Sequence, residues 1–271
     1  MPTVNLGICQ MPVVEEKKEN LKTAAAYVAA AAVRGCRIVI LPEMFNCPYQ
    51  TELFAAYAES YPHGETLQLL GDLAARHRVV LVGGSIPERD SAGRIYNTCF
   101  VFDRNGSLLG KHRKVHLFDI AIAQGTQFQE SAVITAGNAG TVLTVDGLRL
   151  GVAICYDLRF PELARAMVLQ GADILIYPAA FSPVTGPVHW ELLLRARAVD
   201  NQVFTVGVSP AATPGAAYQP YGHSLVVDPW GEPLGQCGSQ EELLCVAVDL
   251  TRLQKVRQEL PLLQHRRPDL Y

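Results

Sequence analysis

Short apolar runs that end in polar or reactive residues recur along this chain of 271 residues. Runs of this length are typical of strands buried on both faces, and α/β proteins commonly place their sites at the carboxyl ends of such strands. The three most informative runs are Ile38–Leu41 before Pro42 and Glu43, Val152–Ile154 before Cys155, and Ile174–Tyr177 before Pro178. We therefore expect a sheet whose strand ends carry the functional residues.

Segments with helical periodicity and turn signals separate the apolar runs. Leu21, Ala25, Val28 and Ala32 recur at helical spacing. Helices are expected at 16–34, 66–77, 161–170 and 188–201 and at the end of the chain. Strands are expected at 4–9, 37–41, 79–82, 97–102, from 108 onward, and at 142–145, 148–155, 174–177, 203–208, 223–227 and 243–249. Strands joined by both hairpins and helical crossovers predict a mixed sheet system covered by helices. An α/β sandwich fits this pattern better than an all-parallel Rossmann sheet.

The composition supports a folded protein with a large core. Hydrophobic residues make up 49% of the chain, and the formal charge is −3, from 23 basic and 26 acidic residues. A chain of this length buries roughly 70–75% of its unfolded surface, so its core can hold a deep pocket. The small negative charge offers no general attraction to a polyanion, so neither nucleic acid nor an anionic membrane is an expected partner.

The sequence also predicts a soluble protein with reduced thiols. No stretch approaches the roughly 20 apolar residues that span a bilayer, and Met1–Gln10 lacks the basic segment of an export signal. The seven cysteines are scattered and form no C-x-x-C pair, which indicates free thiols in a reducing compartment. We therefore expect a cytoplasmic location.

Cys155 is the strongest candidate for a nucleophile. It follows an apolar strand and immediately precedes a predicted helix start, and a helix amino terminus stabilises a thiolate. A free thiol has a pKa of about 8.5, so it needs a neighbouring base or cation to react at pH 7. Glu43 and Lys114 could supply both, although spacing alone does not bring the three residues together.

Three motifs in this order resemble the nitrilase superfamily of carbon–nitrogen hydrolases, over essentially the whole chain. The motifs are Leu41–Glu43, Arg113–Leu117 and Gly151–Glu162. Within the superfamily the chain is most similar to the ω-amidases, which hydrolyse 2-oxoglutaramate and 2-oxosuccinamate. This closer resemblance rests on Glu43–Tyr49, Gly83–Glu88, His116–Ile120, Phe128–Ser131, Thr185–Leu192 and Arg195–Gln202.

The resemblance implies an α/β fold built as a four-layer αββα sandwich, with 1–271 as a single carbon–nitrogen hydrolase domain. It implies a homodimer formed through the helical face, and it requires no metal or organic cofactor. The roles that it implies are general base for Glu43, cation facing the tetrahedral intermediate for Lys114, nucleophile for Cys155, second orienting carboxylate for Glu130, and backbone oxyanion donor for Tyr156.

The expected partner is a small acidic amide. Such a substrate carries its carboxylate several bonds from the reacting amide, so the pocket needs a fixed cation at that distance. Arg159, four residues after Cys155, is the candidate because a guanidinium binds a carboxylate through two parallel hydrogen bonds. The resemblance adds Phe181 and Thr185 at the carboxylate end and Tyr49 in the pocket wall.

Other readings of the active site remain open at this point. A related deaminated-glutathione amidase has a tail similar to Gln264–Tyr271. A Cys-His hydrolase would pair Cys155 with His223. A true nitrilase, or a non-catalytic interaction module on the same scaffold, would also fit the fold.

Two further motifs do not favour a site of their own. His112 and His116 have the i,i+4 spacing that suits a metal only on a helix, whereas their segment is strand-like. The basic run Lys111–Lys114 lacks the interleaved aromatic residues of a nucleic-acid site. We expect a solvated strand with one lysine directed inward.

Overall fold

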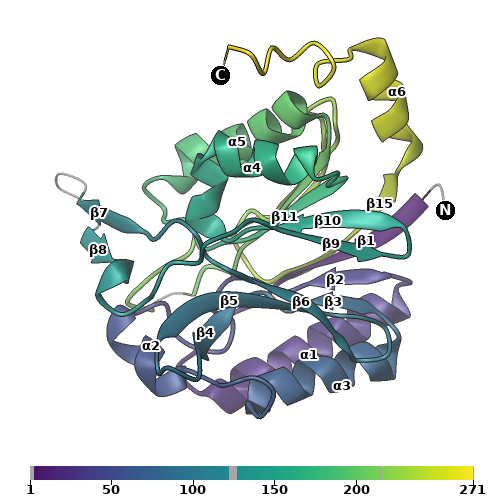
Figure 1. Ribbon diagram of the computed structural model, residues 1–271. Helices are drawn as coiled ribbons and strands as arrows, with labels where there is room; N and C mark the ends of the chain where they lie inside the picture. Colours follow the sequence, from purple (N-terminus) through teal and green to yellow (C-terminus); the bar gives the residue numbers. More distant parts are fainter. Residues whose placement is uncertain (1–2, 122–126, 214, 271) are drawn as a thin grey trace.

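Two β-sheets pack face to face, with helices on their outer faces, in the computed structural model (Figure 1), which describes residues 3–121, 127–213 and 215–270. In this view α1 (Lys17–Val33) and α3 (Glu65–His77) lie below the lower sheet. On the other side, α4 (Pro161–Leu169) and α5 (Gly186–Asn201) lie above the upper sheet. The expected αββα sandwich is therefore confirmed.

The lower sheet takes strands from both ends of the chain. Its strand order is β15-β1-β2-β3-β5-β4, with β6 paired to β5. The strands are β1 (Thr3–Gln10), β2 (Ile38–Ile40), β3 (Val80–Val82), β4 (Ile86–Arg89), β5 (Ile95–Phe102), β6 (Leu108–Arg113) and β15 (Glu242–Asp249). Parallel pairing joins β1, β2 and β3, and antiparallel pairing joins the rest. The sheet is mixed, as the combination of hairpins and crossovers predicted.

The upper sheet has the order β14-β13-β12-β11-β10-β9. Its strands are β9 (Thr141–Val145), β10 (Leu148–Val152), β11 (Ile174–Pro178), β12 (Phe204–Val208), β13 (Leu225–Val227) and β14 (Pro233–Gln236). The parallel strands β10, β11 and β12 form its centre, and α4 and α5 connect them. The strand ends after β10 and β11 therefore face the same edge of this sheet.

Alternation along the strands divides the core into layers. In β1, Leu6 and Ile8 belong to the cluster that fills the space between the sheets, whereas Cys9 belongs to the cluster under α1 and α3. In β2, Ile38 and Ile40 likewise face the other sheet and Val39 faces the helices. Side chains on a strand point alternately to its two faces, so strands that are apolar throughout can serve both layers.

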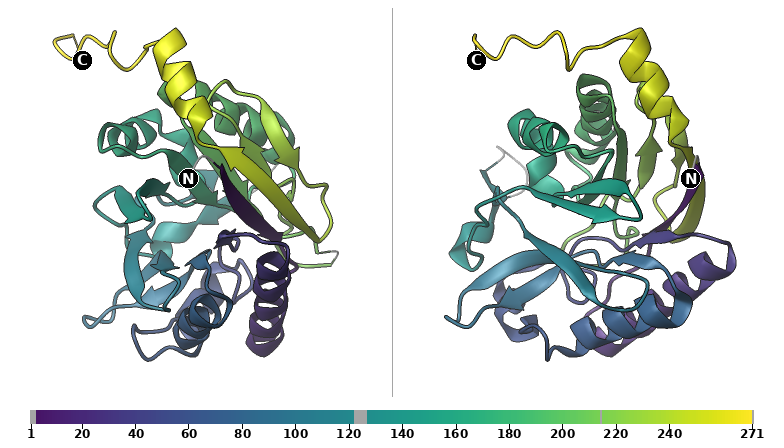
Figure 2. Two further views of the ribbon diagram at one scale, coloured as in Figure 1. Left: turned by 90° about the vertical axis from the view of Figure 1, so that its right-hand side faces the viewer. Right: turned by 45° about the vertical axis from the view of Figure 1, so that its right-hand side comes forward.

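The first and last strands are neighbours. Thr3 to Gln10 of β1 pairs antiparallel with Asp249 to Glu242 of β15 along its whole length, and Figure 2 shows the two strands side by side with α6 (Thr251–Glu259) continuing from β15. In the part of the chain that the structure describes, no helix is long and apolar enough to cross a membrane.

Several elements differ from the sequence-based expectation. The strand expected at 148–155 ends at Val152, because a short 3-10 helix, η2 (Cys155–Arg159), begins at the cysteine. The elements that were not predicted are α2 (Thr51–Tyr57), β4, β14, the small hairpin of β7 (Asp119–Ala121) and β8 (Gln127–Gln129), and the 3-10 turn η1 (Glu130–Ala132). β4 contains Pro87 and Glu88, which disguise it in sequence, and proline is tolerated there because β4 is an edge strand.

Candidate active site

Cys155 lies in a strained turn directly after β10. Its backbone φ of 46° is in the left-handed region, which non-glycine residues rarely adopt. The backbone N–H of Ala180, just beyond β11, forms a hydrogen bond with the thiol that lowers its pKa. Strain of this kind is retained where the surrounding structure enforces it, and it is common at functional sites. The two neighbouring strand ends thus converge on the cysteine sulfur.

Glu43 is held by a tight contact between two loops. Met44, the next residue, has φ 49°, and its N–H donates to Ser85 Oγ at 3.0 Å. Gly84 at φ 58° packs so closely that a Cβ there would lie 2.1 Å from the Pro42 carbonyl oxygen. The two glycines that interrupt the apolar run after β3 therefore have a structural purpose, because Gly84 lets this loop support the segment that presents Glu43.

Lys114 joins two carboxylates at the centre of the site. Its Nζ lies 3.0 Å from Glu43 Oε1 and 2.8 Å from Glu130 Oε2, and all three side chains are fully buried. Lys114 Nζ also forms a longer hydrogen bond, of 3.4 Å, to the Tyr49 hydroxyl. The Phe118 N–H also donates to Glu130 Oε2, at 2.8 Å. Glu43, Lys114, Glu130 and Cys155, named from sequence, are thus brought into one cluster.

Asn97 is a site residue that sequence reasoning missed. Its Nδ2 donates to Glu43 Oε1 at 2.9 Å and to Glu130 Oε1 at 3.2 Å. Its backbone carbonyl accepts from the Lys114 N–H at 2.8 Å. The available signal was the pair of polar residues Asn97 and Thr98 within the mainly apolar strand β5. Asn97 lets two carboxylates approach each other by adding a second donor between them.

The electrostatics keep the Cys155 thiol protonated. Burial raises the pKa of Cys155 well above its ordinary value, and Glu43 raises it further. Burial also raises the pKa of Glu43, against the opposing effect of Lys114. Burial alone would lower the pKa of Lys114, but Glu130 and Glu43 outweigh it and the net pKa is raised. The thiolate stabilisation expected from a helix start is therefore outweighed by burial, and a base must remove the thiol proton.

One oxygen of Glu43 is left for that role. Oε1 accepts from Lys114 and Asn97, whereas the buried Oε2 has no hydrogen-bond partner with good geometry among the described residues. Cys155 lies close enough for a hydrogen-bonding interaction that lowers the pKa of Glu43. A buried carboxylate that interacts with a thiol and has one oxygen without a hydrogen bond is able to accept a proton.

An aromatic wall lies above the charged cluster. Tyr49 packs against Phe128, Phe54 and Tyr218, with ring centroids 5.3, 5.7 and 4.8 Å away. A cavity of about 490 Å³ reaches Glu43, Tyr49, Ala180 and Tyr218, although Cys155 and Lys114 do not line it. Tyr218 was not predicted, because it lies in a Pro- and Gly-rich segment without a periodic pattern. The pocket-wall position of Tyr49 agrees with the sequence-based expectation.

Arg159 has the environment of a residue that is available to an anion. Its guanidinium lies 4.8 Å from the Phe181 ring centroid, and Nη1 lies 3.2 Å from His189 Nδ1. No Asp or Glu of residues 3–121, 127–213 or 215–270 forms an ion pair with it. Phe181 follows Ala180, whose N–H faces the cysteine, so the arginine and the thiol lie on either side of one short segment.

The remaining predicted residues lie near this end of the site. Tyr156, directly after Cys155, packs its half-buried ring against Phe118 and Phe160. Thr185 precedes α5, and its Oγ1 lies 3.3 Å from Ser182 Oγ. The hydroxyl of Thr185 is half-buried rather than enclosed. Among the described residues Thr185 forms no hydrogen bond with Arg159, so its substrate role remains a prediction.

The two histidines considered for a metal converge instead on one buried carboxylate. Asp157 Oδ2 lies 3.1 Å from His112 Nε2, and Oδ1 lies 2.8 Å from His116 Nδ1. Asp157 also accepts from the backbone N–H groups of His116 and Ile154. Burial raises its pKa, but the hydrogen bonds from the histidines outweigh this and lower the pKa below its ordinary value. Asp157 thus ties the segment of Lys114 to that of Cys155.

Other sequence candidates are accounted for by local contacts. Lys111 and Arg113 both bind Glu88, so only Lys114 of the basic run enters the site. His223 stacks on Tyr221, and its carbonyl accepts from the Trp190 indole. The ionisable side chain that interacts with the Cys155 thiol is therefore the carboxyl of Glu43, not this histidine. Among the described residues, no cluster of His, Cys, Asp or Glu is arranged to hold a metal ion.

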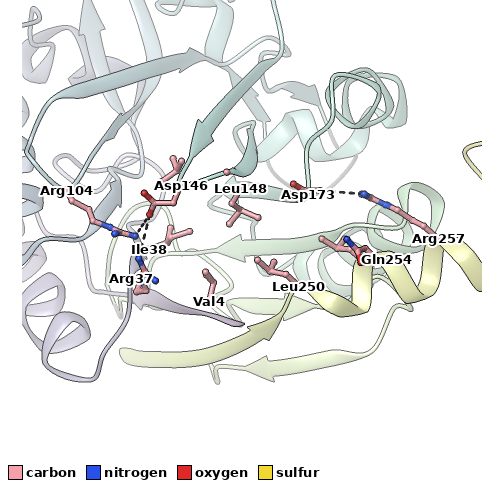
Figure 3. Close-up of a pocket in the computed structure, with 13 residues that line it drawn as sticks. Val4, Arg37, Ile38, Arg104, Asp146, Leu148, Asp173, Leu250, Gln254 and Arg257 are labelled. Atoms are coloured by element: carbon pink, nitrogen blue, oxygen red, sulfur yellow. Dashed lines mark hydrogen bonds and ion pairs between the residues drawn. The ribbon is translucent and has the colours of Figure 1, made fainter. Parts of the chain in front are cut away.

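A second cavity, of about 420 Å³, lies at the end of the sandwich near α6 (Figure 3). Its arginines already face acidic partners: Arg104 and Arg37 contact Asp146, and Arg257 Nη1 lies 3.5 Å from Asp173 Oδ1. None of the catalytic candidates lines this cavity. It is therefore separate from the cysteine site.

The buried Asp157 contacts predict a pH-dependent contribution to stability. The pKa of Asp157 in the folded protein lies below the ordinary 3.8, so its ionised form stabilises the fold fully above about pH 4. This contribution is lost as pH falls towards the folded-state pKa. We expect Asp157→Asn to lower the unfolding free energy by roughly 1–3 kcal/mol at about pH 7. The difference in unfolding free energy between wild type and variant is expected to be smaller near pH 3. Urea unfolding measures this, with Asp72→Asn on the exposed face of α3 as the control. If the difference in unfolding free energy between wild type and Asp157→Asn did not change with pH, ionised Asp157 would not be the source of the stability.

Comparison with known proteins agrees with the geometry. A family model described as carbon–nitrogen hydrolase matches residues 5–258. The chain is 48% identical to a Mus musculus protein named omega-amidase NIT2 and 44% identical to that of Homo sapiens, in each case over 100% of this chain and 98% of the relative.

Solved structures show the same fold. The Saccharomyces cerevisiae protein Nit3, a nitrilase-superfamily member, superposes with a TM-score of 0.91 at 40% identity, covering 98% of this chain and 97% of that one. An amidase mutant from Nesterenkonia sp. AN1, with an acetamide moiety bound covalently to its active-site cysteine, has a TM-score of 0.80 at 25% identity, covering 98% and 95%. The chain belongs to the carbon–nitrogen hydrolase family, within the nitrilase superfamily.

Proposed function

We propose that this enzyme is an ω-amidase, which releases ammonia from the terminal amide of small dicarboxylic acid monoamides such as 2-oxoglutaramate and 2-oxosuccinamate. The observation that carries the proposal is a buried Glu43 carboxyl that interacts with the Cys155 thiol and keeps its Oε2 free of other hydrogen bonds among the described residues, together with an Arg159 that has no acidic partner there. The full-length similarity to proteins named omega-amidase supports the same substrate class.

Acylation begins at the thiol. Glu43 accepts the Cys155 proton as the sulfur attacks the amide carbon, because the raised pKa of the thiol leaves little thiolate at neutral pH. The raised pKa of Glu43 makes its carboxylate a stronger base than an ordinary glutamate. Glu43 then donates this proton to the leaving nitrogen, and ammonia departs. The acyl group remains on Cys155 as a thioester.

Charge developing on the amide oxygen needs donors. The proposed donors are Lys114 Nζ and the backbone N–H of Tyr156, and each donor of this kind contributes about 3–4 kcal/mol to transition-state stabilisation. Two of the Lys114 contacts are short carboxylate bonds, and the contact with Tyr49 is the longest, at 3.4 Å. The Tyr49 contact is therefore the one that the lysine exchanges for the oxyanion.

Deacylation reuses the same base. After ammonia leaves, Glu43 is again ionised and can take a proton from a water molecule whose oxygen attacks the thioester carbon. The C–S bond then breaks, the acid product leaves, and Glu43 returns the proton to the Cys155 sulfur. Glu130 stays bound to Lys114 and Phe118 in both half-reactions and keeps the ammonium in place. The reaction as written uses only the groups of this chain and water.

The far carboxylate of the substrate is assigned to Arg159. The guanidinium lies over the Phe181 ring, with 4.8 Å from Cζ to the ring centroid, and this contact helps to hold it in place. A carboxylate binding there would replace water rather than a protein acid. Phe181 and Thr185 complete that end of the pocket in this proposal, and Tyr49 forms the wall near the reacting amide.

We also propose that the protein is a homodimer in a reducing, cytoplasmic compartment. The outer face of α5 exposes Val188 (60%), Leu192 (63%) and Val199 (41%), beside Trp230 (49%). An apolar patch of this kind is typical of an interface. The compartment is supported by seven cysteines that are all free thiols.

The dimer is tested by placing a charge on the patch. Leu192→Glu puts a carboxylate at the centre of the α5 face and is expected to give a monomer in analytical ultracentrifugation at micromolar concentration. Val14→Glu, at an exposed residue away from α5, is the matched control and stays dimeric. A monomeric wild type would remove the proposal.

The role of Arg159 is tested by comparing charged and neutral amides. We expect Arg159→Ala to lower kcat/KM for 2-oxoglutaramate by roughly 10²–10³-fold, because a buried charged contact is lost, but to affect a neutral amide such as butyramide less than about tenfold. Arg76→Ala, on the exposed end of α3, leaves both unchanged. Equal losses on the two substrates would show that the arginine does not read the carboxylate.

The central experiment measures ammonia release from 2-oxoglutaramate, 2-oxosuccinamate, deaminated glutathione, glutamine and a simple nitrile. The two keto-acid amides are expected to be the best substrates. Cys155→Ala and Glu43→Gln are expected to lose at least about 10³-fold in kcat, with the exposed Cys245→Ala as the control for thiol loss.

The pH profile supplies an independent readout for Glu43. Glu43 acts as a base only when ionised, and its pKa is raised above 4.5. The acid limb of kcat/KM is therefore expected above pH 4.5, with activity lost as pH falls through it.

Two outcomes of the substrate experiment would contradict the proposal. A preference for deaminated glutathione would identify the enzyme as a deaminated-glutathione amidase. Activity in Cys155→Ala would show that Cys155 is not the nucleophile.

A further inference from the structure

Two cysteines outside the catalytic site lie in direct contact. Cys36, in the turn between α1 and β2, has its Sγ 3.3 Å from the Sγ of Cys245 on β15. They are 209 positions apart in sequence, so the fold alone brings them together. We propose that Cys36 and Cys245 form a site of oxidative modification, where a peroxide closes a disulfide between the edge strand β15 and the α1–β2 turn. This inference does not rest on the proposed amidase activity.

The strand between the two cysteines leaves room for this contact. Gly7 of β1 pairs with Cys245 on one side and with Val39 of β2 on the other. A Cβ at Gly7 would lie 3.2 Å from Cys36 Cβ and 3.3 Å from its Sγ. The absence of a side chain at Gly7 therefore lets the thiol of Cys36 reach across β1 to the next strand.

The two thiols differ in exposure, which assigns the order of the reaction. Cys245 is exposed, whereas Cys36 is buried with 4% of its surface exposed. Burial and the neighbouring Cys245 raise the pKa of Cys36 to about 12, opposed by Arg34. Dissolved peroxide therefore reacts with Cys245 first, and the buried Cys36 is the second thiol, which reacts with the oxidised Cys245.

The chemistry balances with hydrogen peroxide as the oxidant. Cys245 sulfur attacks one peroxide oxygen, the O–O bond breaks, and Cys245 sulfenic acid and water form. Cys36 sulfur then attacks the sulfenic sulfur, the S–O bond breaks, and the leaving hydroxide takes the Cys36 proton as a second water. Two thiols lose two electrons in total, and one peroxide gains them.

The bond would brace the open edge of the lower sheet. β15 is the terminal strand of that sheet and is held mainly by its pairing with β1. A cross-link over such a long loop restricts the unfolded chain, and disulfides commonly raise stability for this reason. The oxidised protein is expected to melt roughly 4–16 °C above the reduced protein.

The test uses the full-length protein carrying Cys155→Ala, so that the catalytic thiol cannot react. After treatment with a small excess of peroxide and blocking of free thiols, digestion with trypsin and Glu-C releases Gly35–Arg37 and Leu243–Arg252. Cleavage after Glu242 separates Cys245 from Cys237, which lies in a different fragment. Mass spectrometry is expected to find the first two fragments joined, and dithiothreitol to separate them.

Matched variants decide the outcome. Cys245→Ser, at an exposed position, is expected to lose both the joined peptide and the rise in Tm, and Cys237→Ser is expected to keep both. A bond from Cys36 or Cys245 to Cys9 or Cys237, or peroxide that takes Cys245 only to sulfinic acid, would overturn the pairing. A joined peptide without a change in Tm would overturn the bracing of β15.

Discussion

The site depends on the buried ion pairs that the Lys114 ammonium forms with two carboxylates. A lone charge of this kind costs several kcal/mol to bury, and removing one partner of a buried pair typically costs about 3–5 kcal/mol. Lys114 offsets that cost by binding both Glu43 and Glu130. Asn97 adds a neutral donor to both carboxylates. The chemistry and the local stability therefore depend on the same contacts.

The cluster carries one more negative charge than positive charge. With the thiol neutral, Glu43 and Glu130 outnumber Lys114. An added thiolate would increase that imbalance, and the raised pKa of Cys155 reflects it. In the proposed mechanism, transfer of the thiol proton to Glu43 leaves the charge of the cluster unchanged, which suits a site whose charged side chains are fully buried. The second carboxylate makes the lysine stay charged rather than making the cysteine acidic.

Much of the fold could be predicted from local pattern. The apolar runs of β1, β2, β11 and β12 and the periodic helices α1 and α5 have strong signals, because burial on both faces or one face imposes them. The strands without such a signal are short, exposed or at a sheet edge: β4, β7, β8 and β14. Contacts with residues distant in sequence determine their conformation. Glu88 in β4 is buried only because Lys111 and Arg113 bind it. No short window of sequence contains that partnership.

The candidate site divides in the same way. Glu43, Lys114 and Cys155 follow strand ends, and motif resemblance adds Glu130, so sequence was sufficient to name them. Their meeting depends on β2, β6 and β10, strands of two different sheets. Asn97 and Tyr218 were missed because each acts through a contact distant in sequence. The turn at Cys155 was also missed, because a left-handed backbone at a non-glycine residue has no signature in the apolar run before it.

The pairing of β1 with β15 has a consequence for synthesis on the ribosome. β1 is synthesised long before its neighbour β15, since Thr3 pairs with Asp249. Until β15 has been made, β1 presents an unpaired edge, and such edges favour association with other chains. Contacts between distant parts of a sequence also slow folding. The growing chain therefore needs protection along this edge, and shortening the protein from its C-terminal side would expose it permanently.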